Sequence, residues 1–363
     1  MSLEKTDLTL GFIALADCAA LAVAKAHGHF EAEGLNVTLS REPSWANIRD
    51  KVAVGALDGA HMLGPMAIAA NLGLGGAAAE PLAAPFAMNL NGSAVTVSNA
   101  LAGALREIDP AAMDARPRTA APLARLADQR RARGLPPLTF AVVFPYSVHN
   151  YELRHWLAAG GVEPDRDVRL VVVPPARMVE KLAAGEIDGF CVTAPWNAVA
   201  LIQGLGQVLV HACEIWPRSP DKVFAVTARF AKRHPQTTAA LIRALERAAA
   251  WADPPENRLA LGRLLADPAV VDAPEAAMRL FLLGAGASGG HAFDDPDYII
   301  FHRDGANRPL VEHADWFFDQ MARWGQLPAG ASREAARRAY RPELYDAALD
   351  AQKPSGARPE GSS

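Results

Sequence analysis

The stretch Thr139–Gly161 constrains the fold most, because an apolar run ends at a proline and a helical pattern begins at once. Phe140–Phe144 is short and rich in β-branched and aromatic residues, which predicts a strand. Ser147 is a favourable N-cap for a helix that ends at the glycine pair Gly160–Gly161. This stretch therefore predicts a strand, a sharp turn and a helix, as in an α/β fold.

His149 lies in the first turn of this predicted helix. Free backbone N–H groups and the positive end of the helix dipole meet there, so a small anion is stabilised and a neutral imidazole is favoured. The alternative is a solvated or capping histidine, because one residue by itself is a weak signal. His149 is therefore a candidate donor to an anion.

The same alternation of strands and helices continues along most of the chain. It predicts mainly parallel sheets with right-handed crossovers. A chain of 363 residues is too long for one ordinary core, so we expect two α/β lobes. Residues 107–137 are rich in Pro, Arg and Ala, and predict a surface excursion with one helix around Leu123–Arg131. Its arginines favour a solvated helix face over a site for an acidic partner.

Composition indicates a folded protein that does not bind nucleic acid directly. Half of the residues are hydrophobic, 21% are charged, and the formal net charge is −4. No apolar run is long enough to cross a bilayer, and the N-terminus lacks the pattern of an export signal. Cys18, Cys191 and Cys213 form an odd, widely spaced set, which favours buried thiols in a reducing compartment. We therefore expect a cytoplasmic protein if the chain is complete.

Catalytic and cofactor signatures are missing from the sequence. There is no G-x-S-x-G elbow, no P-loop, no G-x-G-x-x-G after a strand and no H-E-x-x-H, and the histidines lack ligand spacing. We expect no catalytic residue, no metal and no cofactor.

Three further residues occupy positions suited to a ligand. Trp45 begins a helix beside the strand edge where open α/β sheets bind ligands, and its indole N–H can donate to an oxyanion; the alternative is a core or lid residue. Ser93 ends Asn89–Ser93, a first crossing between lobes, although the same letters are a plain turn signal. Lys222 stands before the strand Val223–Thr227, at a second crossing, although most lysines face solvent.

Four segments carry a resemblance to a known family: SWANIRDKVAVGALDGAHML, FPYSVHNYELRHWLAAGGVEPDRDVRLVVVPPARMVEKLAAGEIDGFCVTAPWN, SPDKVFAVTARF and YIIFHRDGANRP. Together they resemble the nitrate- and bicarbonate-binding family of ABC-transporter solute receptors. The resemblance spans roughly Leu8 to Tyr345. It implies the type II periplasmic-binding-protein fold, in which two α/β lobes flank a cleft that the chain crosses twice.

The resemblance also implies a ligand site. Matched by motif, the family's nitrate contacts fall on Trp45, Ser93, Phe144, Tyr146, His149, Pro175 and Lys222. Ser93 stands where transport receptors commonly have Gln, Tyr146–Ser147 where they have Gly-Gly, and Ala194 where they have Glu, so the pocket is remodelled around a shared His and Lys. One lysine charge, a neutral His donor and an indole N–H suit a planar monoanion, whereas a divalent anion more often recruits Arg.

Three functions follow from the resemblance. The favoured one is a cytoplasmic nitrate or nitrite sensor of the NasS-like branch, which sequesters an RNA-binding antiterminator (a NasT-like ANTAR protein) and releases it on ligand binding, thus controlling nitrate assimilation genes. The alternative is the solute-binding component of an ABC importer for nitrate, bicarbonate or organosulfonate. The third is an enzyme, since thiamine-pyrimidine synthases share the fold, but the surroundings of Cys191 lack their cysteine-rich cluster.

The predicted crossings divide the chain. Residues 1–90 and 223–351 are expected to form lobe 1, residues 91–222 lobe 2, and residues 352–363 a disordered tail.

Overall fold

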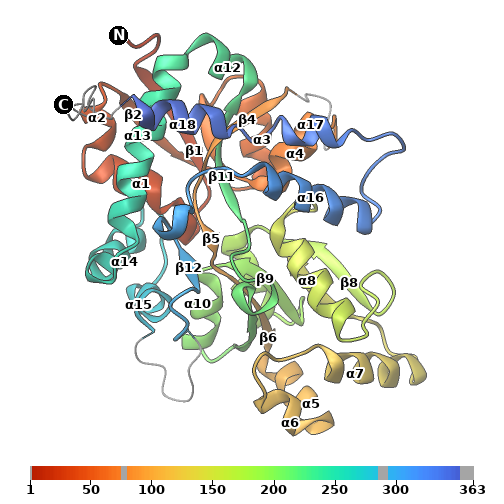
Figure 1. Ribbon diagram of the computed structural model, residues 1–363. Coiled ribbons are helices and arrows are strands. Elements are labelled where there is room, and N and C mark those ends of the chain that lie inside the picture. The colour runs from red at the N-terminus through yellow and green to blue at the C-terminus, as the bar shows by residue number, and fades with distance from the viewer. Residues whose placement is uncertain (1, 75–79, 285–292, 352–363) are drawn as a thin grey trace, which may run out of the picture.

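Two mixed sheets, one in each half of the molecule, organise the fold (Figure 1). The computed structural model describes residues 2–74, 80–284 and 293–351, so the predicted tail at 352–363 lies outside the described residues. The first sheet has the order β2-β1-β3-β11-β4, with β1 Asp7–Phe12, β2 Asn36–Arg41, β3 Gly59–Leu63, β4 Leu82–Ala87 and β11 Lys222–Thr227. The second has the order β10-β6-β9-β7-β8, with β6 Ser93–Ser98, β7 Leu138–Val142, β8 Val168–Val172, β9 Gly189–Thr193 and β10 Gly206–His211. A small ribbon pairs β5 Leu90–Asn91 with β12 Ile299–Ile300.

The expectation of mainly parallel sheets is confirmed, because in each sheet four of the five strands run in the same direction and one strand is reversed. β1 is parallel to β2 and β3, and β7 is parallel to β8 and β9. In contrast, β11 is antiparallel to β3 and β4, and β6 is antiparallel to β9 and β10. The physical reason is that β6 and β11 follow a crossing between the lobes. They therefore enter their sheets from the edge at which the parallel strands end.

Helices pack around both sheets. In the first lobe α1 packs against α13, where Pro235 occupies the first turn and its missing N–H costs nothing. In the second lobe α5 packs against α7, and α8 against β9. The α-helices are α1 Ala19–Ala26, α2 His29–Ala32, α3 Trp45–Ala53, α4 Gly64–Asn71, α5 Asn99–Ile108, α6 Pro110–Asp114, α7 Ala121–Ala132, α8 Val148–Ala159, α9 Met178–Ala183, α10 Trp196–Ile202, α11 Ala212–Ile215, α12 Ala228–Arg233, α13 Pro235–Ala252, α14 Arg258–Ala266, α15 Glu275–Leu283, α16 Val311–Arg323, α17 Arg333–Arg337 and α18 Pro342–Asp350. Short 3-10 turns are η1 Ala16–Cys18, η2 Pro175–Arg177, η3 Pro255–Asn257 and η4 Arg303–Gly305.

The excursion at residues 107–137 holds more structure than the one helix predicted. Besides α7 it contains α6, which Asp109 caps by accepting a hydrogen bond from the Ala112 N–H at 2.9 Å. The Asp109–Pro110 pair is an N-cap followed by a proline at the first helical position, a signal that predicts such a helix. Arg118, which precedes α7, donates from its guanidinium to the carbonyls of Met113 and Val208.

The two crossings run side by side. The Met88 N–H donates to the Lys222 carbonyl, and the Asn91 N–H to the Ser219 carbonyl, each at 2.8 Å. Asn91 and Gly92 have φ of 59° and 99°, and a Cβ on Gly92 would lie 2.9 Å from the Ile299 side chain. The Asn-Gly turn signal is therefore satisfied at the crossing itself.

The lobes touch across the boundary between them. The Ala16 N–H donates to the Ala194 carbonyl at 2.9 Å, and Trp196 Nε1 donates to the Ala14 carbonyl at 3.2 Å. On another side, the Tyr151 hydroxyl hydrogen-bonds Gln326 Oε1 at 2.7 Å. These contacts join the two lobes directly.

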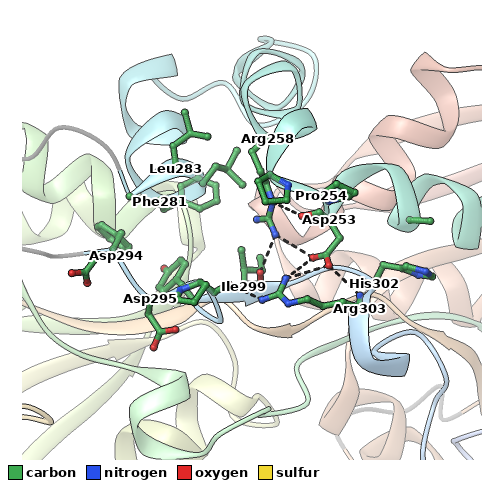
Figure 2. A pocket seen from close by; sticks show the side chains of 17 residues that line it. Asp253, Pro254, Arg258, Phe281, Leu283, Asp294, Asp295, Ile299, His302 and Arg303 are labelled. Atoms are coloured by element: carbon green, nitrogen blue, oxygen red, sulfur yellow. Dashed lines mark hydrogen bonds and ion pairs between the residues drawn. The ribbon is translucent and has the colours of Figure 1, made fainter.

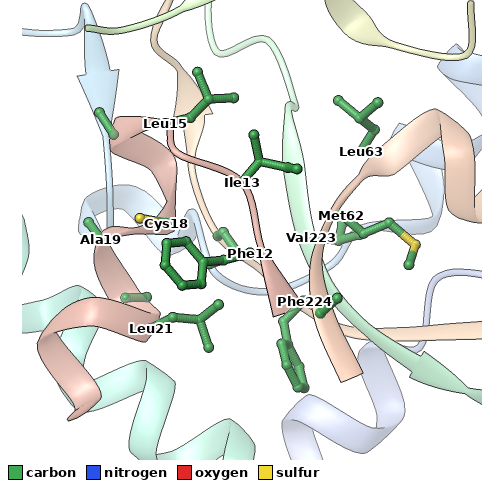
Figure 3. Packing of buried hydrophobic residues seen from close by; sticks show 14 of the residues in the cluster. Phe12, Ile13, Leu15, Cys18, Ala19, Leu21, Met62, Leu63, Val223 and Phe224 are labelled. Carbon is green, nitrogen blue, oxygen red and sulfur yellow. The ribbon is translucent and has the colours of Figure 1, made fainter. Parts of the chain in front are cut away.

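The core of the first lobe lies directly behind this boundary (Figure 3). Phe12, at the end of β1, packs among side chains of α1 and β11, and all of them are buried. Figure 3 labels Phe12, Ile13, Leu15, Cys18, Ala19, Leu21, Met62, Leu63, Val223 and Phe224. This packing holds the ends of β1, β3 and the start of β11 in one place. Cys18 and Cys191 are buried, as predicted, whereas Cys213 is partly exposed.

Candidate anion-binding site

Strand ends from both sheets meet at the interlobe boundary. η1 follows β1, α3 follows β2, α8 follows β7 and η2 follows β8. Because β11 is antiparallel, Lys222 at its start pairs with Leu63 at the end of β3. Thr193 is the last residue of β9. This edge is where open α/β sheets place their ligands.

Lys222 lies in the middle of this boundary and is 1% exposed. Its Nζ donates to Asp221 Oδ1 at 2.6 Å and to Thr193 Oγ1 at 3.0 Å, and it lies 2.8 Å from Asp17 Oδ2. Nζ is also 5.8 Å from the centre of the Trp45 ring. Burial lowers the pKa of Lys222, but the two carboxylates outweigh this and raise the pKa above its ordinary value, so the ammonium stays charged.

The two carboxylates change the charge balance that the sequence suggested. Lys222 was expected to be the formal charge of an otherwise neutral pocket, yet three oxygens lie within 3.0 Å of it. For Asp17, burial opposes ionisation, but Lys222 and His61 hold its pKa well below the usual range. For Asp221, burial and then the charge of Asp17 prevail over Lys222 and raise the pKa. Asp221 is therefore the carboxyl of this pair that protonates more readily.

His149 and Trp45 each present a buried nitrogen to this group. His149 Nε2 lies 2.7 Å from Thr193 Oγ1, while Nδ1 has no hydrogen-bond partner among the described residues. Burial, and secondly the charge of Lys222, lower the pKa of His149 well below its ordinary value, so the imidazole is neutral. Trp45 packs edge-on against His61, with 5.2 Å between the ring centroids, and its Nε1 likewise lacks a partner in the described part of the chain.

Ser93 takes part in a neighbouring buried cluster. Its hydroxyl hydrogen-bonds Glu152 Oε2, and Ser219 Oγ donates to Glu152 Oε1 at 2.8 Å. Burial, with a smaller contribution from Asp221, raises the pKa of Glu152 to about 7. Because Ser93 pairs with Thr193 in the β6–β9 register, this cluster adjoins the Lys222 group.

The remaining predicted residues lie on the same sheet edge. Phe144 and Tyr146 follow β7 and are partly buried, with 6.2 Å between their ring centroids, and Pro175 is buried at the start of η2. Among the described residues, no hydrogen bond or ion pair joins these three to Lys222. The structure thus brings Trp45, His149 and Lys222 together, with Ser93 beside them, while Phe144, Tyr146 and Pro175 stay predicted contacts.

Sequence reasoning missed five residues of this group. Asp17 and His61 come from η1 and β3, Glu152 from α8, Thr193 from the end of β9, and Asp221 from the second crossing. Two of them carried a signal that predicts their place. Asp17 directly follows the apolar stretch Leu8–Ala16, and Asp221 directly precedes Lys222.

A cavity of about 690 Å³ lies elsewhere in the molecule and contains none of the predicted residues (Figure 2). It lies between α13, α14, α15 and the β12 segment. On its wall Asp253 pairs with Arg258 and Arg303 and accepts the backbone N–H of Phe301 at 2.9 Å. These charged side chains neutralise one another, so their role on this wall is to hold the neighbouring segments together. The interlobe group therefore remains the candidate site.

The described residues also bear on two other kinds of function. No group of three or more His, Cys, Asp or Glu side chains among them has the arrangement of a metal site. None of the described helices combines the length and apolar content needed to cross a membrane.

Fold and site together define a two-lobed α/β binding protein whose polar group lies between the lobes. A sequence profile of the NMT1-like family matches residues 1–266, and the chain belongs to that family. The chain is 33% identical over 342 residues to the nitrate/nitrite binding protein NrtA of Synechococcus elongatus, with 92% of this chain and 74% of that protein covered. It is 36% identical over 348 residues to the nitrate import ATP-binding protein NrtC of Synechocystis sp., with 94% of this chain covered but 50% of that protein. The chain thus spans about half the length of the first curated relatives that it matches.

Solved structures agree with this kinship. The periplasmic nitrate-binding protein NrtA from Synechocystis superposes with a TM-score of 0.88 at 29% identity, over 97% of this chain and 90% of that one. The alkanesulfonate-binding protein SsuA from Xanthomonas axonopodis has a TM-score of 0.65 at 18% identity, over 93% and 99% of the two chains, and shows the fold alone. The predicted periplasmic-binding-protein fold is therefore confirmed, and the chain's relative NrtA is named a binding protein rather than an enzyme.

Proposed function

We propose that this chain is a receptor for a small planar oxyanion of the nitrate or nitrite class, enclosed between the lobes at Trp45 and His149. The observation that carries the proposal is the pair of buried nitrogens, Trp45 Nε1 and His149 Nδ1, without partners in the described part of the chain. A buried polar group left without a partner costs about 1–3 kcal/mol, so ligand oxygens at these two nitrogens offset that cost. Lys222 supplies a nearby positive charge.

Kinship supports the same ligand class. NrtA is named a nitrate/nitrite binding protein, and the fold and lobe arrangement of its solved relative match this chain closely. Ser93, Phe144, Tyr146 and Pro175 complete the proposed contact set. Closure of two lobes around a ligand then couples occupancy to shape.

Calorimetric titration with nitrate, nitrite, bicarbonate and an alkanesulfonate tests the proposal. Nitrate or nitrite should bind, and His149→Ala should weaken binding by about tenfold to a hundredfold, the worth of one hydrogen bond to a charged group. His27→Ala is the matched control, because His27 is exposed on α1's C-terminal side. Absence of binding for both nitrogen oxyanions would reject the receptor proposal, and equal losses in the two variants would reject the site.

For the output of binding, we propose a cytoplasmic sensor that holds a NasT-like ANTAR antiterminator in the ligand-free form and releases it when the anion binds. This role is supported by the sequence resemblance to the NasS-like branch. Thermodynamic linkage sets the size of the effect that release requires. To reverse a 99:1 population completely, the anion must favour the released conformation over the antiterminator-bound one by about 5.5 kcal/mol. The second candidate is the binding component of an importer, favoured by the name of the NrtC relative, a nitrate import protein.

A sizing column separates the two outputs. The purified chain and antiterminator should co-elute without anion and separate with nitrate, while the complex formed by His149→Ala should resist nitrate. Separate elution in both conditions, with nitrate binding intact, would favour the importer. Co-elution that nitrate leaves unchanged would also contradict release by the anion.

A further inference from the structure

One hydroxyl connects three groups of the site. Thr193 Oγ1 lies 2.7 Å from His149 Nε2, 3.0 Å from Asp221 Oδ2 and 3.0 Å from Lys222 Nζ. A hydroxyl donates one hydrogen and accepts two. Lys222 can only donate, so the single hydrogen of Thr193 goes either to Asp221 or to His149. Whichever group does not receive it must supply a hydrogen of its own.

These two arrangements differ by one proton. When Asp221 is ionised, Thr193 donates to it, His149 donates through Nε2–H, and Nδ1 carries a bare lone pair. When Asp221 is protonated, it donates to Thr193, Thr193 donates to Nε2, and Nδ1 carries the hydrogen. The imidazole is neutral in both states, in keeping with the lowered pKa of His149. The whole difference in charge therefore lies on Asp221.

The ligand sees this difference at His149 Nδ1, the buried nitrogen without a partner in the described residues. An oxyanion without a hydrogen, such as nitrate, needs an N–H there and is repelled by a lone pair. An oxyanion that carries its own O–H can instead donate to the lone pair. The state of Asp221 thus selects between two kinds of anion.

Charge balance also favours a protonated Asp221 when an anion is bound. With Asp17 and Asp221 ionised, these carboxylates and Lys222 sum to one negative charge before any anion enters. A buried second negative charge is costly, and a proton on Asp221 offsets it. The titratable and charged groups that face Asp221 and His149 from the surrounding elements are Asp17 and Lys222, His61 behind Asp17, Glu152 on α8, Cys191 on β9 and Tyr340 before α18.

We infer that Thr193 and Asp221 form a proton relay that sets which nitrogen of His149 carries the hydrogen, so that binding of an anion without its own proton takes up one proton at Asp221. The relay rests on the proposed anion-binding function and deepens it. Thr193 and Asp221 are positioning residues, because they act on the ligand through His149. The step balances as protein plus anion plus one proton giving the complex.

Titration of nitrate in two buffers of different ionisation enthalpy, repeated at a series of pH values up to the alkaline range, measures the proton uptake. Above the pKa of Asp221 in the free protein, the wild-type protein should take up about one proton per nitrate, and its affinity should fall about tenfold per pH unit. Asp221→Asn should bind without uptake and with little pH dependence. Lys222 donates to Oδ1, so it keeps the amide oxygen on its side and turns the NH₂ group toward Thr193.

Two substitutions at Thr193 supply the matched control. Thr193→Val removes the hydroxyl with little change of shape and should abolish the uptake, while Thr193→Ser keeps the hydroxyl and should retain it. Wild-type binding without proton uptake, or uptake that persists in Asp221→Asn, would overturn the relay while leaving the receptor proposal in place.

Nitrogen-15 NMR of the His149 ring tests the relay without any ligand. At alkaline pH, where Asp221 is ionised, the free wild-type protein should show the Nε2–H tautomer, and free Asp221→Asn the Nδ1–H tautomer. The same tautomer in both proteins would refute the relay. Failure of nitrate to bind at all would reject the proposed function, and the NMR comparison would still decide the relay.

Discussion

Replacing Glu152 by Gln should stabilise the protein at alkaline pH. Glu152 is fully buried between the crossings, where Ser93 and Ser219 hydrogen-bond its two oxygens. Burial raises its pKa from 4.5 to about 7. A carboxyl whose pKa is raised on folding holds its proton more tightly in the folded state, so stability falls as pH rises from 4.5 through about 7.

The magnitude follows from that interval. The difference between 4.5 and about 7, at about 1.4 kcal/mol per pH unit, gives a cost of about 3 kcal/mol once the carboxyl is ionised. A glutamine is neutral at every pH, and its oxygen and NH₂ group can replace both hydrogen bonds to the serines. Glu152→Gln should therefore gain about 2–3 kcal/mol over the wild-type protein at alkaline pH, and little at the acidic end of the interval.

Urea unfolding of both proteins near pH 4.5 and pH 8 checks this, because the first value is the ordinary pKa of the group and the second exceeds the raised one. Glu256→Gln, at an exposed position, is the control and should show no such pH-dependent gap. An equal gap at both pH values, or a Glu152→Gln protein that is less stable at both, would refute the reasoning.

Three further outcomes are expected. Lys222→Ala should lower the free energy of unfolding by about 3–5 kcal/mol, because two buried carboxylates lose their counter-charge; an unchanged urea midpoint would contradict this. Trp45→Phe should remove most of any change in tryptophan fluorescence that nitrate causes. Trp251→Phe, at a ring that packs against His27, should keep that change. The reverse result would show that Trp45 is not the residue that reports binding. A thiol reagent should label Cys213 before the two buried cysteines, and persistence of the first phase in Cys213→Ser would count against the burial pattern.

Local signals predicted much of the fold. Ser147 accepts a hydrogen bond from the N–H group three residues on, as an N-cap does, and α8 ends at Ala159, directly before the glycine pair Gly160–Gly161. Patterns of this kind depend on neighbours within a few residues, so a sequence carries them directly. The direction of β6 and β11 was not local. It depended on where the chain crosses between the lobes, so the expectation of mainly parallel sheets held except for this one reversed strand in each sheet.

The sequence by itself determined which residue types stand at the strand ends, and so the candidates Trp45, His149 and Lys222. Only the tertiary structure decided what surrounds them. Asp17 and Lys222 lie far apart in the sequence, yet their side chains lie 2.8 Å apart in the structure. The charge and the hydrogen-bonding state of the site depend on such contacts, because the energy between buried groups is set by distance and burial. Spacing along the chain predicts neither quantity, and so the carboxylates beside Lys222 emerged only once the strands were assembled.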